Sequence, residues 1–151
     1  MTKALVLYHS QEHGNTAAMA EAVADGLREA GCDVDSFNTN DGRFDVTRFP
    51  QYDCVALGSP DYYSYIAGGL KTFMDDHYIA DVRDGLEGLR AKPYVLFYSH
   101  GGGGRVKDVM GNIFRRIGTL IGEPVGSRGK PDEQILQACK ALGRELARAI
   151  A

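Results

Sequence analysis

Apolar residues gather along the chain in short runs, separated by stretches with helical spacing. Continuous apolar runs at residues 3–9, 52–58 and 92–98 are typical of strands buried on both faces of a parallel sheet. A weaker pattern at residues 32–37 predicts another strand, and residues 123–127 predict a short fifth one. The chain therefore contains five expected strands.

Helical patterns lie between these runs. Residues 15–30, 66–77 and 105–121 place apolar side chains three and four positions apart, and residues 46–49 predict a short helix. The third pattern forms the most regular stripe: Val106, Val109, Met110, Ile113, Ile117 and Leu120. Pro131, followed by two acidic residues, is expected at the first helical position of the last helix.

Alternating strands and helices predict an α/β fold, a doubly wound five-stranded parallel sheet with helices on both faces. No internal repeat or linker interrupts residues 1–151, so a single domain is expected. Folds of this class bind ligands at the carboxyl ends of the strands. The loops that follow the first, third and fourth strands are therefore the candidate site.

Composition narrows the class of protein. No apolar stretch is long enough to span a membrane, the N-terminus lacks a signal-peptide pattern, and three scattered cysteines fit a cytoplasmic chain. A net charge of −3 does not favour nucleic-acid binding. Lys and Arg number 5 against 12 Asp and Glu in residues 1–80, giving −7, and 12 against 8 in residues 81–151, giving +4. We interpret this asymmetry as a solvated surface rather than a docking face.

The loop at residues 10–16 joins a buried strand to a helix and contains Gly14 and several neutral donors. A helix N-terminus there would aim free N–H groups and the helix dipole at one point, which favours an anion such as phosphate. A simple turn with a polar N-cap is the alternative.

The other two loops have unusual compositions. Residues 60–65 place three tyrosines beside a proline, which suggests a stacking surface for a planar ligand or packing against the next helix. Residues 101–104 are four glycines, which suggests close approach of the backbone to a ligand or a flexible hinge. His9 and His100 end two strands at this edge, and we assign catalysis to neither.

Motifs of other nucleotide-binding classes do not occur. No strand is followed by G-x-G-x-x-G, and the chain contains neither a P-loop sequence nor a nucleophile elbow. A phosphate loop, an aromatic loop and a glycine loop without those motifs suggest a mononucleotide with a large flat ring. Flavin mononucleotide (FMN) fits this description best.

The chain resembles flavodoxins and the wider group that includes NAD(P)H-dependent FMN and quinone reductases. The resemblance covers nearly the whole length and favours the short-chain form. Its carriers are Ser10-x-x-x-Gly14-Asn15-Thr16, Gly58-Ser59-Pro60, Leu70-Lys71-x-Phe73-Met74-Asp75, the glycine loop, and Gly129-Lys130-Pro131-Asp132-Glu133 with Leu142-Gly143-x-x-Leu146-Ala147. It implies the sheet order 2-1-3-4-5 and noncovalently bound FMN.

The resemblance also implies which residues contact FMN. The phosphate would be held by Ser10, His13, Gly14, Asn15 and Thr16. The flavin ring would lie along Ser59, Pro60, Asp61, Tyr62, Tyr63 and Tyr65, and against Ser99, His100, Gly101 and Gly102. Glu12 would be repelled by the phosphate, so we expect it to point outward while His13 faces the anion.

The sequence is compatible with two functions. An electron carrier would exchange electrons with redox partner proteins or small acceptors, and an NAD(P)H-dependent reductase would pass electrons to a quinone or free flavin. A phosphate-binding regulatory domain shares the sheet order, but it needs an acidic pair where His9 and Ser10 stand.

Overall fold

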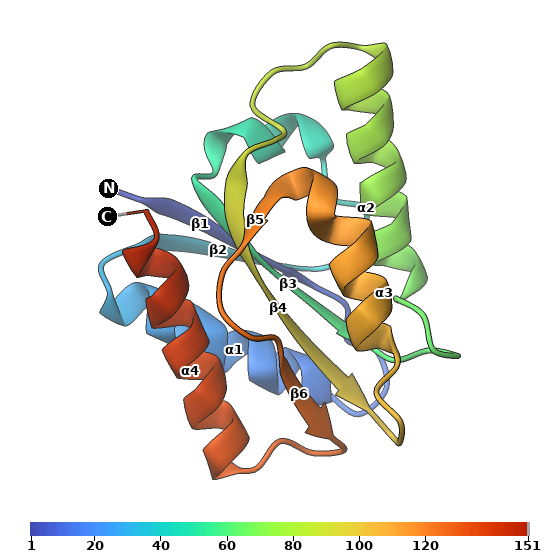
Figure 1. Ribbon diagram of the computed structural model, residues 1–151, viewed down its shortest axis with the longest axis vertical. Coiled ribbons are helices and arrows are strands. Elements are labelled where there is room, and N and C mark those ends of the chain that lie inside the picture. Colours follow the sequence, from blue (N-terminus) through green and yellow to red (C-terminus); the bar gives the residue numbers. More distant parts are fainter. Residues whose placement is uncertain (151) are drawn as a thin grey trace.

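The computed structural model, described here for residues 1–150, contains a central parallel sheet covered by helices on both faces (Figure 1). The strands are β1 (Lys3–Tyr8), β2 (Asp33–Asn38), β3 (Cys54–Pro60), β4 (Lys92–His100), β5 (Gly118–Leu120) and β6 (Val125–Arg128). The helices are α1 (Asn15–Glu29), α2 (Gly68–Tyr78), α3 (Val106–Ile113) and α4 (Glu133–Arg148). Short helical turns are η1 (Val46–Gln51), η2 (Ile79–Arg83) and η3 (Phe114–Ile117).

The strand order β2-β1-β3-β4-β5 confirms the predicted fold, with β6 also paired to β4. Every pairing is parallel, so the strands end at one edge of the sheet. The fifth strand consists of two short pieces, because residues 121–124 leave the sheet between β5 and β6.

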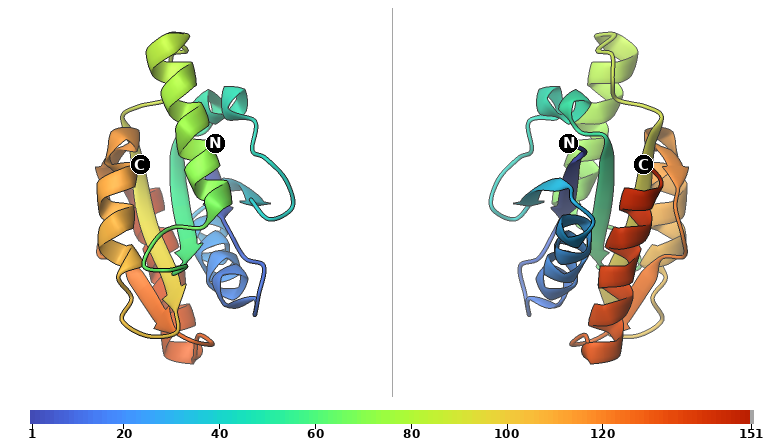
Figure 2. Two further views of the ribbon diagram at one scale, coloured as in Figure 1. Left: turned by 90° about the vertical axis from the view of Figure 1, so that its right-hand side faces the viewer. Right: turned by 90° about the vertical axis from the view of Figure 1, so that its left-hand side faces the viewer.

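The sheet divides the helices into two pairs, and each pair packs against an apolar core on its own face. Alternate side chains of β1, β3 and β4 pack on one face against α2, α3 and η1, and on the other face against α1 and α4. In Figure 2, α2 and α3 lie toward the viewer in the left view, and α1 and α4 in the right view. Gly26 and Gly143 allow α1 and α4 to approach closely, since a Cβ at Gly143 would lie 2.3 Å from the Val23 carbonyl oxygen.

The expected helix at residues 105–121 is wrong in its second half. The α-helix ends at Ile113, η3 follows, and β5 begins at Gly118. Only glycine permits this step, because a Cβ at Gly118 would lie 2.0 Å from the Lys92 carbonyl oxygen. Leu120, expected in the helical stripe, is 40% exposed in β5.

The last helix begins two residues later than predicted. Pro131 precedes α4, and Asp132 is its N-cap, with Oδ1 accepting the Ile135 N–H at 2.9 Å. After α2 the chain also forms a π-helical turn, η2, where the sequence predicted only a polar connection. Among residues 1–150, no helix has the length and hydrophobicity needed to cross a lipid bilayer.

Candidate functional site

A cavity of about 330 Å³ opens where the parallel strands end. The loops after β1, β3, β4 and β6 all contribute to it. Its lining residues are Ser10, Gln11, Glu12, His13, Gly14, Asn15, Thr16, Pro60, Asp61, Tyr62, Ser99, His100, Gly101 and Gly129. The structure therefore brings eleven of the fifteen predicted contact residues together, and leaves out Ser59, Tyr63, Tyr65 and Gly102.

The first loop presents an uncapped helix N-terminus to the cavity. Gly14 is the N-cap of α1 with φ of 77°, a left-handed conformation that glycine adopts without strain. No side chain among the described residues caps the helix, so its first N–H groups can meet a ligand. This geometry suits an anion.

Hydrogen bonds fix the start of this loop. The Ser10 N–H donates to Asn38 Oδ1 at 3.0 Å, and the Asn38 amide donates back to the Ser10 carbonyl at 2.9 Å. His9 is buried behind the loop, with Nδ1 2.7 Å from Thr39 Oγ1 and Nε2 2.5 Å from Gln11 Oε1. The loop is therefore anchored to β2 and the segment that follows it.

Glu12 does not point away from the cavity, so that expectation is wrong. It is among the lining residues, and its Oε1 lies 2.9 Å from His13 Nε2. The Glu12 side chain is 63% exposed, so water screens its charge. His13 nevertheless pairs with a carboxylate rather than standing free for an anion, which weakens the fit of this loop to phosphate.

The tyrosines of the third-strand loop form a tight turn. Backbone N–H groups of Tyr62 and Tyr65 donate to each other's carbonyls, and Tyr63 and Ser64 have φ of 53° and 62°. This pattern matches a type I′ turn, which usually requires glycine or asparagine. Tyr62 lines the cavity with its ring edge-on to His9, whereas Tyr63 projects fully into solvent.

The side chains of Asp61 and Ser59 form hydrogen bonds that hold this loop in place. The carboxylate of Asp61 accepts the Ser64 N–H at 2.7 Å and the Val106 N–H at 3.1 Å, and thus links the turn to the start of α3. The buried Ser59 hydroxyl accepts the Ala67 N–H at 3.1 Å and donates to the Pro60 carbonyl at 2.7 Å. Ser59 is therefore placed to support the loop rather than to touch a ligand.

The fourth-strand loop contributes an unpartnered polar atom. His100 stacks on Tyr98, with ring centroids 5.9 Å apart, and its buried Nδ1 has no hydrogen-bond partner among residues 1–150. Ser99 Oγ lies 2.8 Å from Thr16 Oγ1, which ties this loop to the first. A buried nitrogen without a partner is costly unless a ligand or water satisfies it.

Gln11 and Gly129 were missed by the sequence reasoning. Gln11 sits inside the candidate loop, so its position alone could have included it. Gly129 follows β6, and its N–H donates to the His100 carbonyl at 2.8 Å. That placement depends on the register of β6 against β4, for which the sequence carries no signal.

The three cysteines lie away from this cavity and are buried. Burial raises the pKa of the Cys54 and Cys139 thiols to about 12. Both thiols therefore remain protonated and unreactive near neutral pH.

Comparison with known proteins agrees with this architecture. The family model described as flavodoxin matches residues 6–143. An NAD(P)H dehydrogenase (quinone) of Archaeoglobus fulgidus is 28% identical over 97% of this chain and 96% of its own length.

Solved structures of flavodoxins have the same fold as this chain. A flavodoxin from the domain Archaea has 29% identity and a TM-score of 0.83, with 99% of each chain covered. Oxidised flavodoxin 1 from Bacillus cereus has 20% identity and a TM-score of 0.82, covering 99% of this chain and 100% of that one. Since the family model spans most of the sequence, the chain belongs to the flavodoxin family.

Proposed function

We propose that this protein binds FMN in the cavity at the strand ends and works as an electron carrier. Membership of the flavodoxin family supports both parts of this proposal, the flavin cofactor and the carrier role. The observation that supports FMN most directly is the cavity, which joins an uncapped helix N-terminus to the aromatic side chain of Tyr62 and to His100. These features suit the phosphate and the flat polar ring of one molecule.

The phosphate would be held by the first loop. N–H groups at the start of α1 and the side chains of Ser10 and Asn15 are donors without charge, while Gly14 lets the backbone turn toward the anion. Thr16 is nearly buried and bonded to Ser99, so it would position the loop and contribute its N–H. His13 would hold the Glu12 side chain in place through the 2.9 Å contact between its Nε2 and Glu12 Oε1.

The flavin ring would lie between the third and fourth loops. Tyr62 offers an aromatic contact, and Pro60 and Asp61 form the adjoining wall. On the other side, Ser99, His100 and Gly101 line the cavity. Bound FMN supplies the electron transfer; these residues bind it, orient it and shield it from water.

A second candidate is an NAD(P)H-dependent quinone oxidoreductase. The printed name of the Archaeoglobus fulgidus relative supports it, at 28% identity over nearly the full length of both chains. An enzyme of this kind would take electrons from NAD(P)H directly, whereas a carrier would exchange them with redox partner proteins or small acceptors. We propose a cytoplasmic location for either function.

Rapid mixing of the FMN-loaded protein with NADH and with NADPH separates the two. We expect the flavin colour to persist in both mixtures and to bleach when a chemical reductant is added. Rapid bleaching by either nicotinamide, faster than bleaching of free FMN, would contradict the carrier and support the oxidoreductase.

A further inference from the structure

A second hollow of about 380 Å³ lies between α2 and α3, and it shares no residue with the cavity at the strand ends. It runs along α2 and η2 and is closed on the other side by the end of α3 and the start of η3. Its lining residues are Lys71, Met74, Asp75, His77, Tyr78, Asp81, Val82, Arg90, Asn112, Ile113, Arg115 and Arg116. We call it the α2–α3 cleft.

Apolar side chains line part of the cleft and remain accessible. Met74 and Ile113 are half-buried against the core, whereas Tyr78 is 60% exposed and Val82 is 54% exposed. Large apolar side chains exposed together beside a hollow often mark a binding surface. The π-helical turn η2 displays Val82 at this point, and such turns occur frequently at functional sites.

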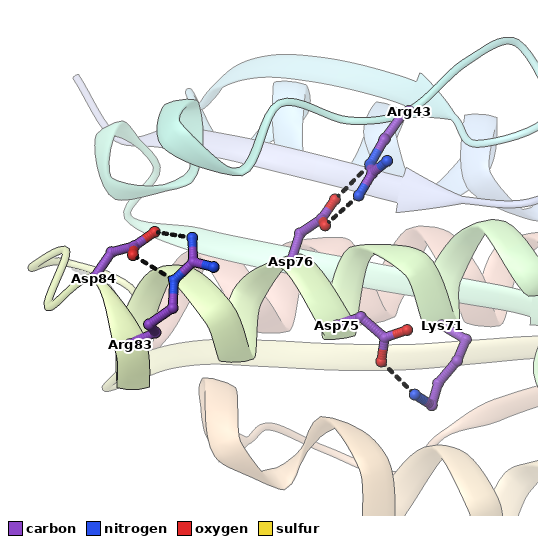
Figure 3. Close-up of polar contacts among 6 residues, drawn as sticks. All are labelled: Arg43, Lys71, Asp75, Asp76, Arg83 and Asp84. Atoms are coloured by element: carbon purple, nitrogen blue, oxygen red, sulfur yellow. Dashed lines mark hydrogen bonds and ion pairs between the residues drawn. The ribbon is translucent and has the colours of Figure 1, made fainter.

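The charges of the cleft do not cancel. Lys71 pairs with Asp75 on the face of α2 shown in Figure 3, and Arg90 pairs with Asp81 at 2.5 Å. Arg115 and Arg116 have no acidic partner among residues 1–150. Four cations and two carboxylates leave a charge of +2 beside apolar walls.

His77 adds no charge at neutral pH. Its Nε2 donates to the Leu89 carbonyl at 2.7 Å, and burial lowers the pKa of the imidazole, in spite of nearby Asp81. The excess positive charge therefore belongs to the two exposed arginines of η3, which directly follows α3. An arginine guanidinium binds carboxylates, sulfonates and phosphates through paired N–H donors.

We propose that the α2–α3 cleft binds a small aromatic anion, a flat apolar ring carrying a carboxylate or sulfonate. Arg115 and Arg116 bind the anionic group, while Met74, Tyr78 and Ile113 contact the ring. The volume falls in the range of small-molecule sites, which are mostly apolar with a few placed polar groups. This site is independent of FMN and of the proposed electron transfer.

Calorimetric titration with 2-naphthalenesulfonate tests the proposal, on the protein as purified and again after saturation with FMN. We expect one binding site per chain, with the same affinity in both titrations. The neutral analogue 2-naphthalenemethanol should bind about tenfold more weakly, because its uncharged hydroxyl cannot form the paired ionic hydrogen bonds that a sulfonate makes with arginine.

Variants locate the site. R115Q/R116Q should lower the affinity for the sulfonate by about tenfold or more and leave the affinity for the neutral analogue unchanged. R105Q/K107Q removes the same charge at the start of α3, outside the cleft, and should change neither affinity. Tyr78→Ala, at an exposed position, should weaken both ligands, and circular dichroism checks that each variant is folded.

Three results would overturn the proposal. One is the absence of saturable binding of the sulfonate. Another is equal loss of affinity in R115Q/R116Q and R105Q/K107Q, which would show only a general effect of charge. The third is displacement of the sulfonate by FMN, which would place it in the other cavity.

Discussion

The cavity at the strand ends and the α2–α3 cleft are hollows of similar size, built from different parts of the chain. Loop backbone forms much of the cavity, including the uncapped start of α1 and glycines from two other loops. Side chains of α2, η2, α3 and η3, together with Arg90, form the cleft, and several of them are charged. Backbone donors suit an anion of fixed shape, whereas exposed arginines adapt to many anions.

This difference decides how each hollow responds to substitution. Around the cavity, positions are fixed by hydrogen bonds such as those of Ser59 and Asp61, so small changes should alter folding as well as binding. Arg115 and Arg116 are exposed, and removing them should cost affinity without cost in stability. Substitutions in the two hollows can test that contrast, and the largest expected effect is at Ser59.

Ser59→Ala should lower the free energy of unfolding by about 1–3 kcal/mol, because it leaves the buried Ala67 N–H without a partner. Ala67 is the N-cap of α2, so this hydroxyl joins the cavity wall to the helix that borders the cleft. Urea unfolding measures the change. Ser127→Ala, which removes a buried hydroxyl with one hydrogen bond, is the control and should cost less.

Replacing Tyr63-Ser64 by Asn-Gly should raise the free energy of unfolding by about 1–2 kcal/mol, because both residues have left-handed φ values that cost energy for most side chains. FMN affinity should stay the same, since Tyr63 projects into solvent. A large loss of FMN affinity would mean that Tyr63 folds over the ring, as the sequence analysis allowed.

Gly14→Ala should weaken FMN binding by about tenfold. A left-handed alanine costs about 1–2 kcal/mol, so the free loop relaxes out of this conformation and must return to it to bind the phosphate. Gly31→Ala is a matched control at the other end of α1, with φ of 91° and equally open space. Fluorescence titration with FMN compares them. If both variants lost affinity equally, the first loop would have no special role.

Glu12→Gln should tighten FMN binding by about twofold to fivefold at low salt, because it removes an exposed like charge beside the phosphate. Riboflavin, which lacks the phosphate, should bind both proteins equally. An equal gain for both ligands would argue against a phosphate in this loop.

Acidification should destabilise the protein through His77. Burial lowers its pKa in the folded state, so the unfolded chain binds the proton more readily. The contribution is complete above the ordinary histidine pKa of about 6.5 and is lost progressively as pH falls below it. His77→Gln should flatten this part of the pH profile of unfolding in urea; an unchanged profile would assign the effect elsewhere.

The sequence predicted the cavity better than the cleft for a physical reason. Parallel strands end at one edge, so the unusual loops after β1, β3 and β4 had to meet there. Each of these loops could be identified from local composition. The tight pairing of Glu12 with His13 was not predictable, because it depends on how the two side chains orient.

The cleft is formed by elements that the sequence pattern predicted wrongly or not at all. A continuous apolar stripe over residues 105–121 predicted one helix, whereas α3 ends at Ile113 and the chain turns into β5. Gly118 was the available signal for that break. The cleft also requires η2, whose π-helical geometry has no sequence signature, so Arg115 and Tyr78 could not be placed together beforehand.

Titration of the purified, flavin-free protein with FMN and with riboflavin tests the central claim most directly. We expect saturable binding of one FMN per chain, with quenching of flavin fluorescence, and clearly weaker binding of riboflavin because the start of α1 has no phosphate to hold. Failure to bind either flavin, in a protein that circular dichroism shows to be folded, would contradict the account.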